Sequence, residues 1–274
     1  MFESILKNVQ QKSPLVHCIT NYVTVNDVAN AILACGASPI MADDINEVED
    51  ITSICNATYI NIGTLNERTI ESMIKAGKKA NSLGHPVVLD PVGAGASKFR
   101  TDTTFKLLDE IKFSVIRGNI SEIKTIYTGN GKTKGVDADV SDKVTEETID
   151  DAVLLAKDMS KRFGSVIVIT GAIDIVSDEN KAYVIRNGHP VMSKITGTGC
   201  MLTGIIAAFV AANRENITEA VAAAISLMGL SGELGYLRMK ENNAGTSSLR
   251  TYLIDEISKI DDSTLKGGMK VEIR

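Results

Sequence analysis

The sequence predicts an α/β fold, in which helices cover both faces of a mostly parallel central sheet. Short apolar, β-branched runs recur along the chain, and they are continuous enough to be strands buried on both faces. Most of these runs are followed by a stretch of helical periodicity. Repeated strand–helix units of this kind give a parallel sheet between two layers of helices.

Six of these runs are predicted to be parallel strands. They are PLVHCIT (14–20), SPIMA (38–42), TYINIG (58–63), PVVLDP (86–91), FSVIRGN (113–119) and VIVITG (166–171). In a sheet of this kind the carboxyl ends of the strands face the ligand crevice. The residues that directly follow each strand are therefore the first candidates for a functional site.

The pattern changes after the sixth strand. Residues 172–195 alternate strand-like pieces with Ser-Asp-Glu-Asn and Asn-Gly turns, which predicts a small antiparallel meander at the sheet edge. Apolar, alanine-rich helices are expected at 201–213 and about 217–239, and an amphipathic helix at 247–260. The last ten residues, LKGGMKVEIR, are predicted to be a tail. Because no stretch resembles a linker, we expect one domain over residues 1–274.

Composition excludes several classes of protein. The net charge of −5 and the lack of a Lys/Arg run argue against nucleic acid as a partner. The first residues lack the pattern of a secretory signal. The apolar stretches 201–212 and 220–230 are shorter than the roughly 20 residues of a membrane span, so we expect no membrane association and a cytoplasmic location. Four cysteines without a CxxC pair argue against a disulfide framework and a zinc site.

The segment ITGTGCMLTG (195–204) is a glycine-rich turn that opens into an apolar helix. Gly197 and Gly199 let a ligand approach the backbone, and the N–H groups of Thr198 to Cys200 at the helix start favour an anion. The alternative interpretation is a tight turn that binds nothing. The spacing fits neither a Walker A loop nor a dinucleotide-binding turn.

The segment VVLDPVGAGAS (87–97) ends a buried strand with a carboxylate. Asp90 precedes Pro91 and a Gly-Ala-Gly turn, which would leave the carboxylate at the mouth of the crevice. One interpretation is that Asp90 holds Mg²⁺ directly or through water, because this ion prefers hard oxygen ligands and retains waters. The other is that Asp90 only caps a turn.

The segment SVIRGNISEI (114–123) offers a second set of polar groups after a strand. Arg117 is suited to clamp a phosphate, because its guanidinium binds oxygens in pairs. Asn119 and Glu122 stand three residues apart at a helix start, where both could organise a hydrated metal ion. The competing interpretation is a capping box, in which these two side chains satisfy the helix terminus and nothing else.

Two further strand ends carry polar residues. Thr170 and Gly171 end the sixth strand, where the hydroxyl would reach a nucleotide phosphate unless it only serves the turn. The first strand runs into a polar segment, which we expect to bind a ligand or to line an interface. Its polar residues are His17, Thr20, Asn21, Thr24, Asn26 and Asp27. His17 taken alone is more typical of a buried structural histidine.

These segments together resemble a known family. In this order and at these separations, HCITNYVTVNDVANAILACGASPIMAD, LDPVGAGAS, IRGNISEI, VITGAIDIVSD and ITGTGCMLTG closely resemble the hydroxyethylthiazole kinases of thiamine salvage, which belong to the ribokinase-like superfamily. The resemblance covers essentially the whole chain. It implies a ribokinase-like three-layer α/β/α fold and transfer of the ATP γ-phosphate to the alcohol of 4-methyl-5-(2-hydroxyethyl)thiazole.

The resemblance also implies roles for single residues. Arg117 and Thr170 would contact the ATP phosphates, with Gly171 beside them. Asn119 and Glu122 match the superfamily's Asn-x-x-Glu magnesium motif, and Asp90 would complete the hydrated metal site.

The substrate side of the expected site lies between subunits. Met41 and Gly197 match positions where the family contacts the thiazole, and we expect Asn21 to join them. The family's proteins are homotrimers with the thiazole bound at subunit interfaces, which would place the polar segment from Asn21 to Asp27 at such an interface.

One position departs from the wider superfamily. Related sugar and vitamin kinases end the glycine loop in Gly-x-Gly-Asp and use the Asp as general base, whereas this chain has Cys200, as is typical of the thiazole kinases. Phosphoryl transfer depends mainly on positioning and charge neutralisation. Thr198, Gly199 and Cys200 would supply loop amides to the transferred group. We therefore expect the Cys200 thiol either to position the substrate hydroxyl or to accept its proton late.

Two other functions remain open at this point. The first is a related vitamin-precursor kinase that acts on a hydroxymethylpyrimidine or a pyridoxal-type alcohol. The second is a nucleotide-binding protein that keeps the fold without turnover.

Overall fold

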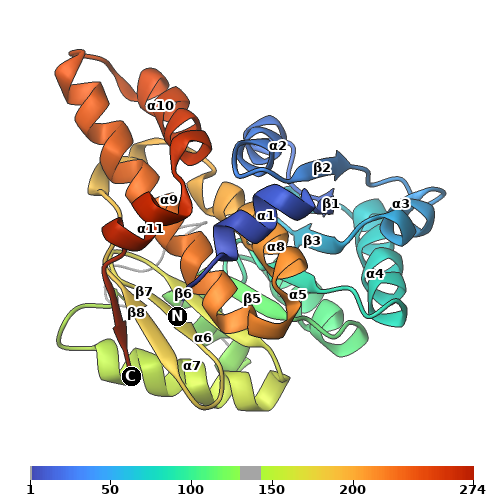
Figure 1. The fold of residues 1–274 in the computed structure, drawn as a ribbon. Coiled ribbons are helices and arrows are strands. Elements are labelled where there is room, and N and C mark those ends of the chain that lie inside the picture. The colour runs from blue at the N-terminus through green and yellow to red at the C-terminus, as the bar shows by residue number, and fades with distance from the viewer. Residues whose placement is uncertain (1, 130–142) are drawn as a thin grey trace.

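A nine-stranded sheet runs through the computed structural model, which describes residues 2–129 and 143–274 (Figure 1). Within these ranges the strand order is β2-β1-β3-β4-β5-β6-β7-β8-β9. The strands from β2 to β6 pair in parallel, and β7, β8 and β9 extend the sheet in antiparallel. Their bounds are β1 Leu15–Ile19, β2 Ser38–Met41, β3 Ala57–Asn61, β4 Val87–Asp90, β5 Val115–Asn119, β6 Val166–Thr170, β7 Asp174–Ser177, β8 Ala182–Ile185 and β9 Val271–Ile273.

Two layers of helices cover the sheet. Successive strand residues point to opposite faces, so Val115 joins one hydrophobic core and Ile116 the other. The helix layer on one face consists of α1 Ile5–Lys12, α2 Val25–Ala34, α8 Thr198–Ala212, α9 Ile217–Glu241, α10 Thr246–Lys259 and α11 Asp262–Gly268, of which α10 packs on α9 and α2. The other face is covered by α3 Val48–Ile54, α4 Glu67–Ser82, α5 Lys98–Glu110, α6 Ile120–Thr128 and α7 Ile149–Phe163. The three-layer α/β/α prediction is confirmed.

The helix α8 lies at the centre of its layer and positions the site. It packs against β1, β3 and β4 beneath it and against α2 and α9 beside it. Its residues from Cys200 to Val210 are all buried, which explains why the sequence is apolar around the whole helix. A helix held on every side keeps its two ends at fixed places, and its N-terminus lies at the carboxyl ends of the central strands.

The six predicted parallel strands and the antiparallel β7–β8 pair are confirmed, but two details were wrong. The predicted meander ends at β8, and Pro190–Lys194 forms a short 3₁₀ helix, η2, instead of strand. The predicted tail is structured: Leu265 to Gly268 complete α11, and β9 pairs with β8 through Ile185–Val271 and Tyr183–Ile273. Three residues are too short for a strand to be recognised from alternation alone.

One described helical stretch, Arg214–Glu241, has the length and apolar composition of a membrane span. Within it, 78% of the most apolar 18-residue window is buried inside the protein. The buried face packs on β7, β8 and α8, while the distal part of α9 projects with α10 as a helical hairpin beyond the sheet (Figure 1). Burial of this extent is typical of a core helix.

Candidate active site

The N-terminus of α8 is the centre of the candidate site. Gly197 precedes the helix with a left-handed backbone (φ 83°) and offers no side chain to cap it. The first N–H groups of a helix have no partner inside the helix, and the helix dipole makes this end positive. The amides of Thr198, Gly199 and Cys200 therefore form a site suited to an anion such as a phosphate.

Both glycines of the loop lie too close to neighbouring side chains to carry a Cβ atom. A Cβ atom on Gly197 would lie 2.4 Å from Cγ2 of Thr24, in addition to the strain of its positive φ. A Cβ atom on Gly199 would lie 2.6 Å from Nη1 and 2.7 Å from Nη2 of Arg117. The guanidinium of Arg117 thus lies directly against the first turn of α8, which concentrates positive charge there.

Arg117 lies in the middle of β5 and links the neighbouring strands. Its Nη2 donates a 2.6 Å hydrogen bond to Oγ1 of Thr170 at the end of β6. Its Nη1 lies 3.4 Å from Oδ1 of Asp90 at the end of β4. Its Nε is buried and has no hydrogen-bond partner. This guanidinium therefore retains donor capacity, which a phosphate oxygen would satisfy.

Asp90 is fully buried at the centre of a hydrogen-bond network. Its Oδ2 accepts from Thr203 Oγ1 at 2.9 Å, from Asn61 Nδ2 at 3.0 Å and from Tyr59 OH at 3.4 Å. Burial raises the pKa of Asp90, although Arg117 and these donors act in the opposite direction. The structure thus surrounds one carboxylate with three donors and a cation, far more than a turn cap requires.

Asn119 and Glu122 form the capping box that the sequence left as an alternative. The Asn119 side chain accepts from the Glu122 amide at 2.9 Å, and Glu122 Oε2 accepts from the Asn119 amide at 2.8 Å. Glu122 Oε1 also accepts from the Gly93 amide at 2.7 Å. Capping does not exclude a metal role, because each carboxylate oxygen has a second lone pair.

The charge on Glu122 is costly in this structure. Burial, followed by the charge of Asp90, raises the pKa of Glu122 to about 7. Within the described part of the chain, no three His, Cys, Asp or Glu side chains cluster tightly enough to enclose a metal ion. The pair of buried carboxylates nevertheless fits Mg²⁺, which binds one or two carboxylates and takes its other ligands from water and substrate phosphates.

Cys200 is 9% exposed and lies in the first turn of α8. Its Sγ accepts hydrogen bonds from Asn21 Nδ2 at 3.2 Å and from Asn61 Nδ2 at 3.4 Å. Burial and then the charge of Asp90 raise the pKa of this thiol. The lowering that a helix N-terminus alone would give is outweighed, so the geometry favours a neutral thiol.

Two other predicted site residues, Met41 and Gly171, make their described contacts outside this cluster. Met41 ends β2, the edge strand, where it is half-buried against the core and pairs in register with Cys18 of β1. Gly171 is exposed, and its amide donates to Oδ1 of Asp174 at 2.9 Å. The structure therefore brings together Asn21, Asp90, Arg117, Thr170, Gly197, Thr198, Gly199 and Cys200, with the Asn119–Glu122 pair adjoining Asp90.

Sequence reasoning missed the residues that support Asp90 and Cys200. Tyr59 and Asn61 lie two residues apart on β3, so they share one face of the sheet. Thr203 lies one turn beyond Gly199. Asp174, which begins β7 and accepts from the Gly171 amide, was also missed, and burial raises its pKa to about 7. The polar Tyr-x-Asn at the end of an otherwise apolar strand was the available signal.

His17 has a structural role in this chain. It is fully buried, with Nδ1 2.9 Å from Oγ1 of Thr52 and Nε2 2.8 Å from the carbonyl oxygen of Ala42. Both ring nitrogens are therefore paired within the protein, as the sequence favoured.

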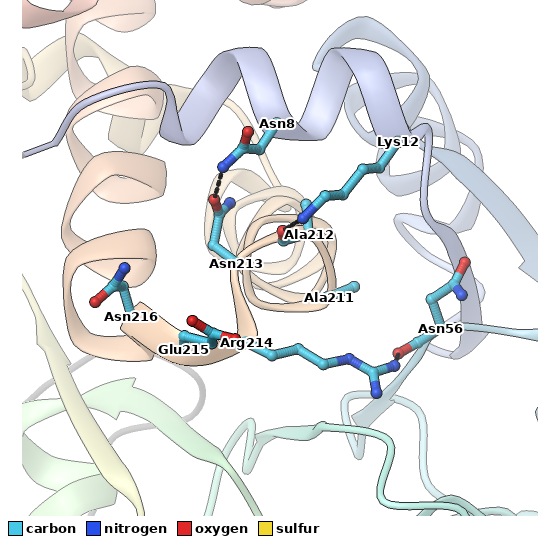
Figure 2. Close-up of a pocket in the computed structure, with 9 residues that line it drawn as sticks. All are labelled: Asn8, Lys12, Asn56, Ala211, Ala212, Asn213, Arg214, Glu215 and Asn216. Carbon is cyan, nitrogen blue, oxygen red and sulfur yellow. Dashed lines mark hydrogen bonds between the residues drawn. The ribbon is translucent and has the colours of Figure 1, made fainter.

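A polar hollow of about 460 Å³ lies at the opposite end of α8 (Figure 2). Lys12 Nζ donates to the Ala212 carbonyl at 2.5 Å, and Arg214 Nη2 donates to the Asn56 carbonyl at 3.0 Å. Its cations thus bind the protein's own backbone, at a helix end whose dipole disfavours anions. This hollow has the size of a ligand pocket but lacks the convergent reactive groups of the α8 N-terminus.

The chain has the three-layer fold of ribokinase-like proteins. A ribokinase-like superfamily protein from Enterococcus faecalis V583 matches with a TM-score of 0.62 over 94% of this chain and 89% of that chain, and at 13% identity it shows the fold alone.

The chain belongs to the hydroxyethylthiazole kinase family, whose model matches residues 6–263. Hydroxyethylthiazole kinase of Clostridium acetobutylicum is 60% identical over 99% of both chains. The hydroxyethylthiazole kinase structure from Pyrococcus horikoshii OT3 matches with a TM-score of 0.88 and 35% identity, over 100% of this chain and 98% of that chain. The resemblance predicted from the motifs is confirmed.

Proposed function

We propose that this chain, acting as one kinase domain, transfers the γ-phosphate of ATP to the hydroxyl of 4-methyl-5-(2-hydroxyethyl)thiazole in thiamine salvage. Membership of the family supports the reaction. The observation that carries the assignment to this site is the uncapped N-terminus of α8, against which Arg117 lies beside Asp90. A loop of free amides next to a guanidinium and a buried carboxylate is suited to a phosphoryl group in transfer.

In this proposal ATP binds with its phosphates across the ends of β5 and β6. Arg117 and Thr170 already share a hydrogen bond, so both face the same space. Gly171 leaves the backbone open beside them, and Asn119 begins α6 on the same side. The amides of Thr198, Gly199 and Cys200 would hold the transferred group while negative charge spreads over its oxygens.

Asp90 and Glu122 are the residues that would hold Mg²⁺. The raised pKa of both buried carboxylates supports this role, because a bound cation would favour their ionised forms. Bound Mg²⁺ would neutralise phosphate charge during transfer. Within the protein, Thr203 and Asn61 orient the Asp90 carboxylate, and the Gly93 and Asn119 amides orient that of Glu122.

The alcohol would bind beside Cys200, with Asn21, Gly197 and Met41 as the contacts expected from the family. During transfer the alcohol oxygen bonds to the γ-phosphorus, the bond from that phosphorus to the β–γ bridging oxygen breaks, ADP leaves with the electron pair, and the hydroxyl proton is released late. A buried, neutral Cys200 is better suited to position the hydroxyl than to act as a strong base.

The proposal includes a homotrimer with sites between subunits and a cytoplasmic location, where ATP is available. Tyr22 and Val23 directly follow the site residue Asn21 and are 77% and 59% exposed. Two adjacent apolar side chains exposed at the edge of a site are typical of a surface that a second subunit covers. Light scattering on the purified protein tests the assembly, and a monomer that is active at all concentrations would contradict it.

A substrate panel tests the chemical assignment. Purified protein with ATP and Mg²⁺ is offered the thiazole alcohol, a hydroxymethylpyrimidine and pyridoxal, while ADP release is coupled to NADH oxidation and products are identified by mass spectrometry. We expect rapid phosphorylation of the thiazole alcohol only. Preference for either of the other alcohols would assign a different vitamin-precursor kinase, and no ADP release with any of them would favour a nucleotide-binding protein without turnover.

A further inference from the structure

Two amide side chains converge on the sulfur of Cys200. Asn21 reaches it from the loop after β1, and Asn61 reaches it from the end of β3. Both amides are at most 4% exposed. The proposed reaction uses Asn61 only to orient Asp90, and no family motif described above gives it a role toward Cys200.

The orientation of both amides is fixed by backbone groups. Asn61 Oδ1 accepts from the Gly63 amide at 2.8 Å, and Asn21 Oδ1 accepts from the Thr24 amide at 3.1 Å. A backbone N–H can only donate, so each side-chain oxygen must face it and each amide presents its NH₂ group to the side on which Cys200 lies. The two amides also bond to each other, from Asn21 Nδ2 to Asn61 Oδ1 at 3.0 Å.

The side chains of Asn21 and Asn61 pack against Gly63, which has no side chain. A Cβ atom on Gly63 would lie 2.9 Å from both Asn21 Nδ2 and Asn61 Oδ1. The absence of that atom lets the amides pack against the Gly63 backbone. The two amides are therefore buried and held in one orientation, with their NH₂ groups toward Cys200.

Both amides present only N–H groups to the sulfur, so the sulfur is the acceptor in these contacts. The thiol hydrogen of Cys200 then cannot point toward either amide. We propose that Asn61, acting with Asn21, is a positioning residue that fixes the Cys200 sulfur as a hydrogen-bond acceptor and turns its S–H away from both amides, toward the reacting alcohol. This inference rests on the proposed kinase function, because it assigns Cys200 to the alcohol.

Asn61 has two further contacts that the test must separate from its contact with the sulfur. Its Nδ2 also lies 3.0 Å from Asp90 Oδ2 and 2.9 Å from the Tyr59 hydroxyl. Loss of activity in an Asn61 variant could therefore arise through Asp90. Thr203 provides a matched control, because it donates to the same Asp90 oxygen at 2.9 Å and has no side-chain bond to the sulfur.

A double-mutant cycle distinguishes the two routes. Asn61→Leu is combined with Cys200→Ala, and Thr203→Val is combined with Cys200→Ala, with kcat and the KM for the alcohol measured in each protein. We expect Asn61→Leu to lower kcat about tenfold in the native background and less than about twofold when Cys200 is absent, since coupled residues are not additive. The effect of Thr203→Val should be the same in both backgrounds. Equal effects of Asn61→Leu in both backgrounds would overturn the proposal.

Gly63→Ala provides a second variant if Asn61→Leu does not fold. It displaces the amide pair without removing a donor, and its backbone needs no left-handed φ. We expect a similar loss of kcat that also disappears when Cys200 is replaced by Ala. A loss that persists without Cys200 would contradict a role through the sulfur.

A readout that needs no turnover separates this inference from the kinase assignment. The rate at which iodoacetamide alkylates Cys200 is followed against pH by peptide mass spectrometry, which resolves Cys200 from the other cysteines. The charged or titratable groups around the sulfur are Asp90 from β4, Tyr59 from β3 and Arg117 from β5.

Amide donors stabilise a thiolate, so Asn61→Leu should shift the alkylation midpoint upward, and by more than Thr203→Val does. An unchanged midpoint would overturn the proposal even if the kinase reaction is present. A shifted midpoint in a protein that phosphorylates no alcohol would contradict the function and leave the amide arrangement standing.

Discussion

The two ends of α8 differ in how their terminal backbone groups are satisfied. At the N-terminus Gly197 leaves the first amides without a side-chain cap, and Arg117 adds charge instead of removing it. At the C-terminus the protein satisfies the last carbonyls. Lys12 donates to the carbonyl of Ala212 (Figure 2), and Asn213 donates to that of Phe209. The functional end of α8 is therefore identified by its helix N–H groups that lack a partner. The polar hollow at the other end is large, but its size does not indicate a functional site.

The largest expected effect tests this contrast with one arginine at each end. Arg117→Met removes the donors that face the loop, and we expect kcat/KM to fall about 10²- to 10³-fold, as when other preorganised transition-state donors are removed. Arg214→Met at the other end loses one exposed bond to a carbonyl and should change kcat/KM less than about twofold. Steady-state ADP release measures both. A similar loss in the two variants would remove the distinction between the ends.

Glu122, near the N-terminus of α8, should make the free energy of unfolding depend on pH. In the folded chain the pKa of Glu122 is raised to about 7 from its ordinary value of 4.5. Between these pH values the folded chain holds a proton that the unfolded chain releases, so the stabilisation is complete below pH 4.5 and is lost as the pH rises to about 7. The loss amounts to about 3 kcal/mol.

Urea unfolding at a series of pH values, without nucleotide or metal, measures this dependence. Glu122→Gln should flatten the decline between pH 4.5 and about 7. Asp174 titrates in the same direction, so the difference between the native and variant curves isolates Glu122. Glu215→Gln, which removes an exposed carboxylate beside the other end of α8, should leave the curve unchanged. Parallel curves for the native chain and Glu122→Gln would show that Glu122 is not the group responsible.

A smaller effect is expected from one added methyl group. Gly199→Ala places a carbon about 2.6 Å from the Arg117 guanidinium, which must then move away from the loop. Because Gly199 has no positive φ, and alanine is favourable in a helix, stability should be kept while kcat/KM falls about tenfold. Gly245→Ala before α10 meets no atom within 4 Å and is the matched control. Full activity in Gly199→Ala would mean that the guanidinium does not act from its observed position.

Much of the fold was readable from the sequence because local pattern and topology agree. Each parallel strand is a continuous apolar run, and each crossover is a periodic helix, so layers and strand direction followed. The C-terminal strand β9 was missed for a physical reason. Its three residues gain their structure from pairing with β8, which lies far away in sequence, and no local pattern encodes that partner.

The site was predictable where chemistry sits directly after a strand or in the glycine loop. Asp90, Arg117, Thr170 and Cys200 were found in this way, and the structure brings them together. Asn61 was missed because it contributes through contacts between distant segments: 29 residues separate it from Asp90 and 139 from Cys200. Position in sequence identifies groups that touch a ligand, whereas the groups that orient them are visible only after folding.

The smallest effect on kcat should occur at the C-terminus of α8, where the protein satisfies the helix carbonyls. Asn213 is 8% exposed, and its side chain bonds to Asn8 and to the carbonyls of Ile5 and Phe209. Asn213→Ala leaves buried carbonyls without their donor, which we expect to lower the free energy of unfolding by about 1 to 2 kcal/mol in urea titrations. Its kcat should stay within about twofold of the native value, since α8 remains held on every side.

Asn216→Ala provides the control within the same hollow. Asn216 lines it but makes no side-chain cap at the start of α9, so its replacement should change the free energy of unfolding by less than about 0.5 kcal/mol. If Asn213→Ala instead reduced kcat tenfold in a fully folded protein, a change at the C-terminus of α8 would be altering the glycine loop some 15 residues away along the helix. The functional distinction between the two ends would then be one of degree, because a rigid helix would be coupling them.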